Sequence, residues 1–284
     1  MRNFNLRHVA LSVFMAVFAA FSLQAQSVHV KWSYARMDGS RTGVTAASAN
    51  DVSKALGRVD GDTYYAPNGK VFKGGSVVSV ASAVLGVQPV MANVKEVIGY
   101  SSKAMVRSYP ECELSNLFID VIMDRVSRET GKKVDVGIAN FGGIRVDMPQ
   151  GDILLDDIMS MFPFKNNIVY VSLKGSSLLK LFENMAKTKF QVLGGVNIEC
   201  EDGELDKVLV GGNDIDPDKI YGVATISFLL NGGDDLFLGK NAIEQIDIPI
   251  DISEVMIDYV KAQTIAGRPV EYEKDGRVVI KKED

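Results

Sequence analysis

The chain has 284 residues, of which 46% are apolar and 24% are charged, so it has the composition of a globular protein with ample length for a core. Its formal net charge of −5 argues against the basic surface that nucleic-acid-binding proteins use. Only two histidines are present, His8 and His29, and the chain contains no HExxH stretch. Because zinc and two-metal hydrolases draw several imidazoles into their sites, the sequence argues against a self-contained two-metal centre.

The chain begins with the pattern of a secretory signal peptide. Arg2 and Arg7 precede the apolar run VALSVFMAVFAAFSL, and small residues follow in QAQS. A membrane anchor needs about 20 apolar residues, and this run is shorter. We therefore expect residues 1–26 to be removed and the mature protein to be exported, either to the periplasm or out of the cell, without a membrane span.

Residues 27–96 form an N-terminal segment to which the sequence assigns no role. The stretch SANDVSKALG predicts a short helix with a Ser48 cap and an end at Gly57. The stretch DTYYAPNGKVF predicts a hairpin that turns at Pro67-Asn68-Gly69. None of these patterns carries a recognisable chemical function.

Residues 97–284 give stronger signals. Apolar residues at helical spacing, followed by Gly131, predict a helix that buries one stripe: Leu114, Leu117, Phe118, Val121 and Ile122. Next come a buried strand in VDVGIA (134–139) and a helix in DILLDDIMSMF capped by Asp152. Further strands are expected in NIVYVSL, GVNIEC, KVLVGG and IYGVATI, and helices in GSSLLKLFENMAK and SEVMIDYVKAQ. A closing hairpin is expected in VEYEKDGRVVI, around Asp275-Gly276.

These elements do not follow a strict βα alternation, so we predict an α+β domain with a mixed β-sheet and packed helices. Export permits a disulfide, and Cys112 and Cys200 are the only cysteines. They either form one bridge or remain as two buried thiols, and the sequence does not choose between these alternatives.

Three segments carry candidate binding chemistry. In NFGGIR (140–145), glycines without a Cβ let a ligand approach backbone amides, and Arg145 offers a planar fork for phosphate. In FPFKNN, a proline-stiffened loop presents Phe164 as a stacking face, and FLLNGGDD places Phe228 near the carboxylate of Asp234. The alternative is structural: a turn after a strand, a core phenylalanine and a type I′ hairpin.

Together with two further segments, these motifs resemble the C-terminal domain of the 5′-nucleotidase / UDP-sugar hydrolase family. The family pattern runs E-x-x-x-[GS]-N-L, N-G-G-G-I-R, P-F-G-N, Q-V-x-G and G-G-D-G. The chain has, in the same order, ECELSNL (111–117), NFGGIR (140–145), PFKNN (163–167), QVLGG (191–195) and NGGDD (231–235). It departs from the pattern at four positions, which are Phe141, Lys165, Leu193 and Asp235.

The resemblance implies that this domain binds a nucleotide. The base would lie between Phe164 and Phe228, and Asp234 would receive the ribose hydroxyls. A further family arginine lies just before the first motif, and Arg107 is near that place. The substrate-binding residues implied by position are Asn140, Gly142, Gly143, Arg145, Phe164, Phe228 and Asp234.

Family enzymes also carry an N-terminal metallophosphatase domain, for which residues 27–96 are too short. We therefore expect no catalytic residue, metal site or cofactor in this chain, with divalent metals held by a partner. The resulting hypothesis is a nucleotide-binding domain of an exported 5′-nucleotidase system, which acts in nucleotide catabolism with a separate metallophosphatase. The alternatives are a non-catalytic nucleotide- or nucleoside-binding protein and a degenerate domain kept for protein contacts.

Overall fold

The computed structural model describes residues 39–45, 47 and 51–281. Residues 42–284 belong to one compact unit, and the described part of the chain before it is the 3₁₀ turn η1 (Gly39–Arg41). The predicted signal peptide and the Ser48 cap lie outside the described residues. None of the helices in the described part combines the length and the apolar character that a membrane crossing requires.

Residues 51–87 form a small group of elements with its own apolar cluster of Tyr64, Ala66 and Val78. The strands β1, β2 and β3 pair in an antiparallel sheet, and the predicted turn at Pro67-Asn68-Gly69 joins β2 to β3. Gly57 ends α2 with a φ of 77°, in the left-handed region that glycine favours. The elements are α2 (Val52–Leu56), β1 (Arg58–Asp60), β2 (Thr63–Tyr65), β3 (Val71–Lys73) and α3 (Gly75–Val87), and the 3₁₀ turn η2 (Ala92–Lys95) follows them.

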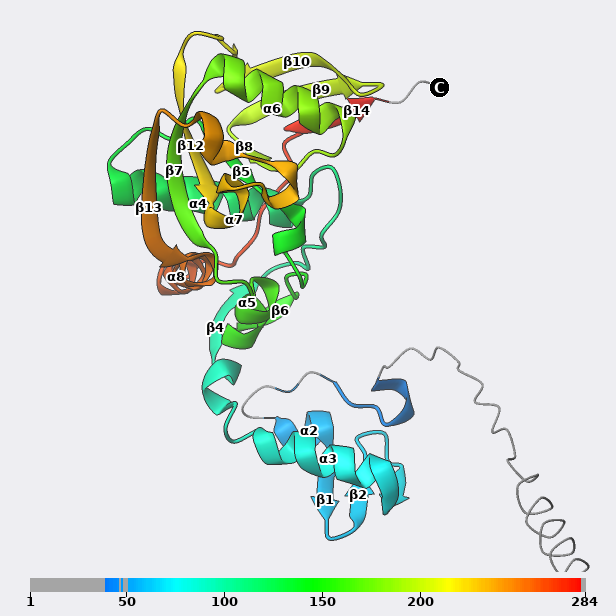
Figure 1. Cartoon of the computed structure of the whole chain (residues 1–284). Coiled ribbons are helices and arrows are strands. Elements are labelled where there is room, and N and C mark those ends of the chain that lie inside the picture. Colours follow the sequence, from blue (N-terminus) through cyan, green and yellow to red (C-terminus); the bar gives the residue numbers. More distant parts are fainter. Residues whose placement is uncertain (1–38, 46, 48–50, 282–284) are drawn as a thin grey trace, which may run out of the picture. The chain divides into compact units, whose positions relative to one another are not determined.

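The larger part of the fold is built on a five-stranded sheet with the order β13-β7-β12-β5-β8 (Figure 1). Its strands are β13 (Glu244–Asp251), β7 (Asn167–Lys174), β12 (Ile220–Ile226), β5 (Val136–Ala139) and β8 (Val192–Gly194). The β12–β5 pair is parallel and the other three pairs are antiparallel. This mixed sheet confirms the predicted α+β class.

Two smaller sheets adjoin this one. The first has the order β11-β10-β9-β14, in which β14 runs parallel to β9, and the second is the antiparallel pair β4–β6. Their strands are β11 (Asn213–Asp214), β10 (Glu204–Val210), β9 (Val196–Glu201), β14 (Val278–Lys281), β4 (Val97–Ser101) and β6 (Gly151–Leu154).

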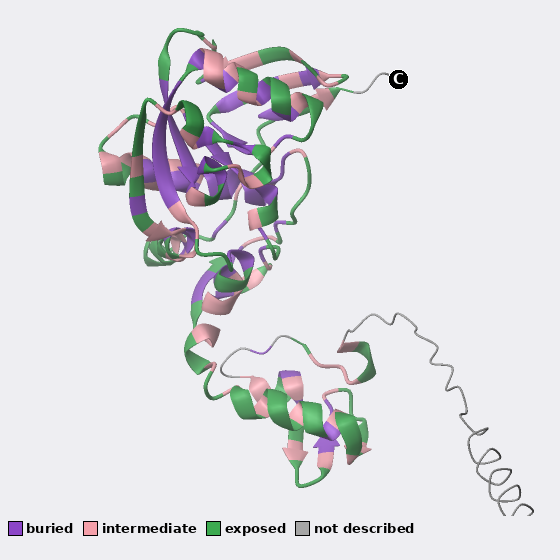
Figure 2. Cartoon of the chain, viewed as in Figure 1, coloured by how far each residue is buried: buried purple, intermediate pink, exposed green. Residues whose placement is uncertain are grey.

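The helix α4 (Glu113–Thr130) crosses the five-stranded sheet and provides much of the core. Its predicted apolar stripe is buried, and Gly131 ends it with a φ of 65°. The central strands β7 and β12 are buried along most of their length (Figure 2). Both cysteines are buried free thiols, and the Sγ of Cys112 accepts a hydrogen bond from the Ser115 N–H at the start of α4. The remaining helices are α5 (Leu155–Met161), α6 (Gly175–Lys187), α7 (Ser227–Leu230) and α8 (Ile252–Ile265).

Two local predictions are wrong. Asp152 does not cap a helix, because residues 151–154 pair with β4 as strand β6. The helix begins only at Leu155, where the Asp157 carboxylate accepts the Leu154 N–H at 2.8 Å. The predicted hairpin around Asp275-Gly276 also does not form, since the strand β14 pairs with β9 instead.

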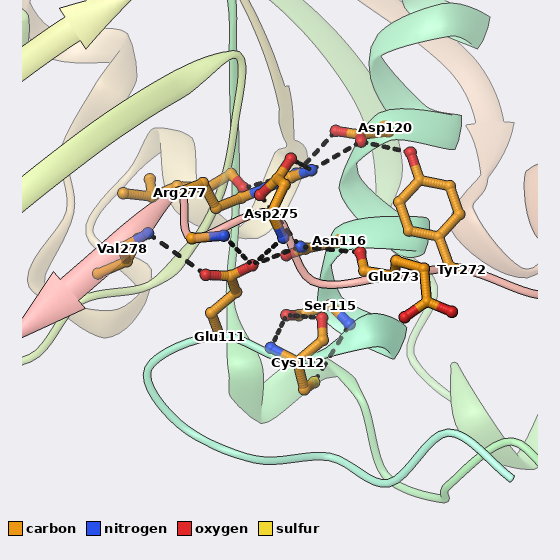
Figure 3. A network of polar contacts seen from close by, with 12 residues as sticks. Glu111, Cys112, Ser115, Asn116, Asp120, Tyr272, Glu273, Asp275, Arg277 and Val278 are labelled. Carbon is orange, nitrogen blue, oxygen red and sulfur yellow. Dashed lines mark hydrogen bonds and ion pairs between the residues drawn. The ribbon is translucent and has the colours of Figure 1, made fainter.

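The segment that was expected to form this hairpin is held by side chains (Figure 3). The Glu111 carboxylate accepts hydrogen bonds from the N–H groups of Asp275 at 2.9 Å and Gly276 at 3.1 Å. It also accepts one from Asn116 Nδ2 at 2.7 Å. A buried carboxylate therefore supplies the acceptors that a neighbouring strand would have supplied.

The Arg277 side chain, which is 6% exposed, completes this arrangement. Its guanidinium contacts both oxygens of Asp120 at 2.9 and 3.0 Å and both oxygens of Asp275 at 2.9 and 2.7 Å. Tyr272 donates to Asp120 at 2.6 Å. The hydrogen bonds from Arg277 hold the pKa of Asp275 below its usual value. We call this set of residues, Glu111, Asn116, Asp120, Tyr272, Asp275 and Arg277, the C-terminal network.

Candidate functional site

The topology of the five-stranded sheet brings the three candidate segments to one edge. Residues 140–145 follow the end of β5, and Phe228 follows the end of β12. Because β5 and β12 are parallel, these two ends lie on the same side. The strand β7 runs antiparallel to β12 with Ile168 opposite Ile226, so the loop 162–167 enters the sheet at that same edge.

A pocket of about 490 Å³ opens where these segments meet. We call it the edge pocket. It is lined by Asn140, Gly142, Gly143, Phe164, Lys165, Asn166, Phe228 and Asp234. Six of the seven residues implied by the resemblance are therefore brought together in one hollow, and Arg145 is the exception.

The glycines of the 140–145 segment lie close to the Asn140 side chain. A Cβ on Gly143 would lie 2.8 Å from Asn140 Oδ1, and a Cβ on Gly142 would lie 3.3 Å from Asn140 Nδ2. Neither glycine has a positive φ, so space and not a left-handed backbone explains the residue type. The two glycines therefore leave room for the Asn140 amide at the pocket wall.

Asn140 and Asp234 form the polar side of the edge pocket. Asn140 is 6% exposed, and its Nδ2 donates to Asp234 Oδ2 at 2.8 Å across 94 positions of sequence. Its Oδ1 is buried and has no hydrogen-bond partner. A buried acceptor without a partner costs about 1–3 kcal/mol, and a hydrogen bond from a donor would remove this cost.

Phe164 and Phe228 form the aromatic side. These two residues are 48% and 44% exposed, which is unusual for large apolar residues. Within the described chain, neither ring forms a stacked or edge-on pair with another aromatic ring. The predicted hairpin alternative at 231–235 is wrong, since the short helix α7 is followed by the 3₁₀ turn η4 (Gly233–Asp235). A Cβ on Gly233 would lie 2.4 Å from the Phe228 carbonyl oxygen, so this glycine permits the tight turn that places Phe228 beside Asp234.

Arg145 lies next to the edge pocket and not in its wall. Its guanidinium carbon is 5.8 Å from the centre of the Phe164 ring, and Nη1 donates to the Gly142 carbonyl at 3.4 Å. Arg145 forms no ion pair with the nearby Asp147, whose Oδ1 accepts the Arg107 N–H at 2.8 Å. The Arg107 side chain donates to the Ile144 carbonyl, so both arginines flank the same loop.

Sequence reasoning missed two residues of the pocket wall, Lys165 and Asn166. The signal was present, because both follow Phe164 directly in a loop already chosen as a stacking face. One of the four departures from the family pattern, Phe141, has a structural explanation. Phe141 is buried and packs edge-on against Tyr109 with ring centres 6.0 Å apart, so its ring does not line the pocket.

Comparison with known proteins gives a family match. A family model described as the 5′-nucleotidase, C-terminal domain, matches residues 90–239, which is a little over half of the chain. An apyrase of Tabanus yao is 26% identical over 200 residues, which cover 60% of this chain and 35% of the apyrase. The cell wall protein Lmo0130 of Listeria monocytogenes serovar 1/2a is 25% identical over 264 residues, which cover 82% of this chain and 33% of that protein.

A solved structure gives the same result. The 5′-nucleotidase precursor of Thermus thermophilus superposes with a TM-score of 0.64 at 26% sequence identity, covering 73% of this chain and 44% of the precursor. This chain spans about a third of the length of the two curated relatives named above.

Proposed function

Because the chain belongs to the family of the 5′-nucleotidase C-terminal domain, we propose that it is the substrate-recognition part of an exported 5′-nucleotidase system. In this proposal it acts with a separate metallophosphatase in nucleotide hydrolysis and catabolism. The observation that carries the proposal is the edge pocket, which two half-exposed phenylalanines line together with a hydrogen-bonded asparagine–carboxylate pair.

The chemistry of the pocket fits the parts of a nucleotide. A planar base would stack between Phe164 and Phe228, and stacking on an aromatic ring contributes about 1–3 kcal/mol per base. Asp234 would accept the ribose hydroxyls, since only its Oδ2 is occupied by Asn140 in the described chain. Arg145 would meet the phosphate, because its guanidinium forms no ion pair with a described carboxylate.

A partner would supply the catalytic metals. In the described part of the chain, no three His, Cys, Asp or Glu residues gather as ligands of one metal ion. Support for export comes from the pattern of residues 1–26 and from the Listeria relative, which is named a cell wall protein. Both the separate metallophosphatase and the exported location belong to this proposal.

Hydrolysis assays test the division of labour. We expect the purified chain alone not to release phosphate from AMP with Mn²⁺, Co²⁺ or Zn²⁺, and a mixture with a candidate metallophosphatase to exceed the rate of either protein alone. The control is the same mixture with Phe228→Ala, which removes a stacking face from the edge pocket. Metal-dependent turnover by the isolated chain that survives stringent purification would contradict the need for a partner.

Calorimetric titration tests the ligand assignment. Arg145→Ala should weaken AMP binding about tenfold and leave adenosine binding nearly unchanged, because adenosine has no phosphate. Asp234→Ala should weaken both ligands to a similar extent and should not affect dideoxyadenosine, which lacks the ribose hydroxyls. Equal loss of AMP and adenosine binding in a folded Arg145→Ala protein would end the phosphate assignment. If these ligands bind as expected but no metallophosphatase is activated, the chain is a nucleotide-binding protein without a catalytic role.

A further inference from the structure

Lys165 stands beside the stacking ring in a turn of fixed shape. The Asn166 N–H donates to the Phe164 carbonyl at 3.0 Å, and the Asn166 carbonyl accepts the Ile252 N–H at 3.1 Å. These bonds fold residues 164–166 into a tight turn and fasten it to the start of α8. All three consecutive residues line the edge pocket.

The ammonium group of Lys165 is free to meet a ligand. Lys165 is exposed, and the ion pairs of the described residues all involve other cations. The carboxylate in the pocket wall, Asp234, already accepts a hydrogen bond from Asn140. The resemblance places a glycine at position 165, so this cation is a feature of the present chain.

The three side chains of the turn have different recognition chemistry. A base stacked on the Phe164 ring would present its edge to Lys165 and Asn166, because they belong to the same turn. The Asn166 amide carries both a donor and an acceptor, so it fits an amino or a carbonyl substituent equally well. An ammonium group can only donate, so it fits a carbonyl oxygen or ring nitrogen and opposes an amino group.

From this arrangement we propose that Lys165 sets the base preference of the edge pocket and selects 6-oxopurines over 6-aminopurines. The inference rests on the proposed function, because it assumes that a base occupies the pocket. Lys165 donates to the O6 and N7 acceptors of a 6-oxopurine such as hypoxanthine. In adenine the 6-amino group takes the place of O6, and two donors then face each other.

Inosine and adenosine are the matched probes, since they differ at position 6 and its neighbouring ring nitrogen and neither carries a phosphate. The full chain is titrated calorimetrically with each nucleoside. We expect inosine to bind about tenfold more tightly than adenosine, which is the effect of one charge-assisted hydrogen bond. Lys165→Met roughly keeps the length of the side chain and removes its charge. It should therefore weaken inosine binding and bring the affinities for inosine and adenosine close together.

Controls separate this proposal from its premise. Lys180→Met, on the exposed face of α6 and outside the pocket wall, should leave both affinities unchanged. The role of Lys165 would be overturned if the tenfold preference for inosine persisted in Lys165→Met. It would also be overturned if the wild-type protein bound inosine and adenosine with equal affinity. Equal weakening of IMP and AMP in Lys165→Met, with both nucleosides unaffected, would assign the lysine to the phosphate and overturn the base preference. Wild-type protein that binds neither nucleosides nor nucleotides would instead overturn the proposed function itself.

Discussion

The C-terminal network and the edge pocket both contain polar side chains, but they differ in how many of their hydrogen-bonding groups already have partners. In the network, the Glu111 carboxylate receives two backbone N–H groups and an amide, and the Arg277 guanidinium binds two carboxylates. In the pocket, Asn140 Oδ1 is buried without a partner, and Lys165 has no ion pair with a described carboxylate.

The difference indicates separate roles. Satisfied buried groups stabilise one arrangement of the backbone, whereas unsatisfied or exposed groups leave interactions for a ligand. Substitutions in the network should therefore lower stability and leave ligand selectivity alone. Substitutions in the pocket should change ligand binding and leave stability nearly unchanged.

The largest effect is expected at Glu111. Glu111→Ala should lower the free energy of unfolding by about 3 kcal/mol, because buried N–H groups of residues 275 and 276 would lose their acceptor. Urea denaturation measures this change. Glu113→Ala is the matched control, since Glu113 lies two positions away and pairs with Lys103 near the surface, and it should cost less than about 1 kcal/mol. A folded Glu111→Ala protein of normal stability but altered nucleotide selectivity would contradict the separation between a structural network and a binding pocket.

A smaller effect, confined to binding, is expected at the aromatic rings. Phe164→Ala and Phe228→Ala should each weaken nucleoside binding by about 1–3 kcal/mol. Their stability should change little, because both rings are close to half exposed. Phe237→Ala is the control: this ring is 52% exposed but does not line the pocket, so binding should persist. If both pocket variants lose stability and keep binding, the rings serve the fold and not the ligand.

Much of the fold and of the pocket could be predicted from the sequence. The apolar spacing from Leu114 to Ile122 identified α4, because a helix that covers a sheet must bury one stripe. The pocket residues were found through short motifs whose order matches a known domain. Their meeting at one edge depends on the parallel β5–β12 pair, which no local pattern encodes.

The errors arise where distant parts of the chain replace local partners. Asp152 has the residue type of a helix cap, but its backbone pairs with β4, about 50 positions earlier in the chain. Asp275-Gly276 has the sequence of a hairpin turn, but Glu111 supplies the acceptors for those N–H groups. Lys165 and Asn166 were missed because the family pattern drew attention only to Phe164 in that loop.

The smallest effect concerns the backbone of the turn that carries Asp234. Asp234 and Asp235 have φ values of 49° and 59°, in the left-handed region that side chains other than glycine rarely adopt. Asp234 has a compensating contact with Asn140, but Asp235 is exposed and stands where the resemblance places a glycine. Asp235→Gly should relieve this strain, and the greater freedom of glycine in the unfolded chain should offset part of the gain. We expect a net increase in stability of about 0.5 kcal/mol.

A gain of that size corresponds to an increase in Tm of about 1–2 °C for a domain of this length, which calorimetry can resolve. Asp202→Gly is the matched control, because Asp202 has a φ of 47° in the turn between β9 and β10, away from the edge pocket. Both variants should gain similar stability and bind nucleosides as the wild type does. If Asp235→Gly alone loses nucleoside affinity while remaining stable, the Asp235 carboxylate takes part in binding. Asp235 must then be counted among the binding residues of the edge pocket.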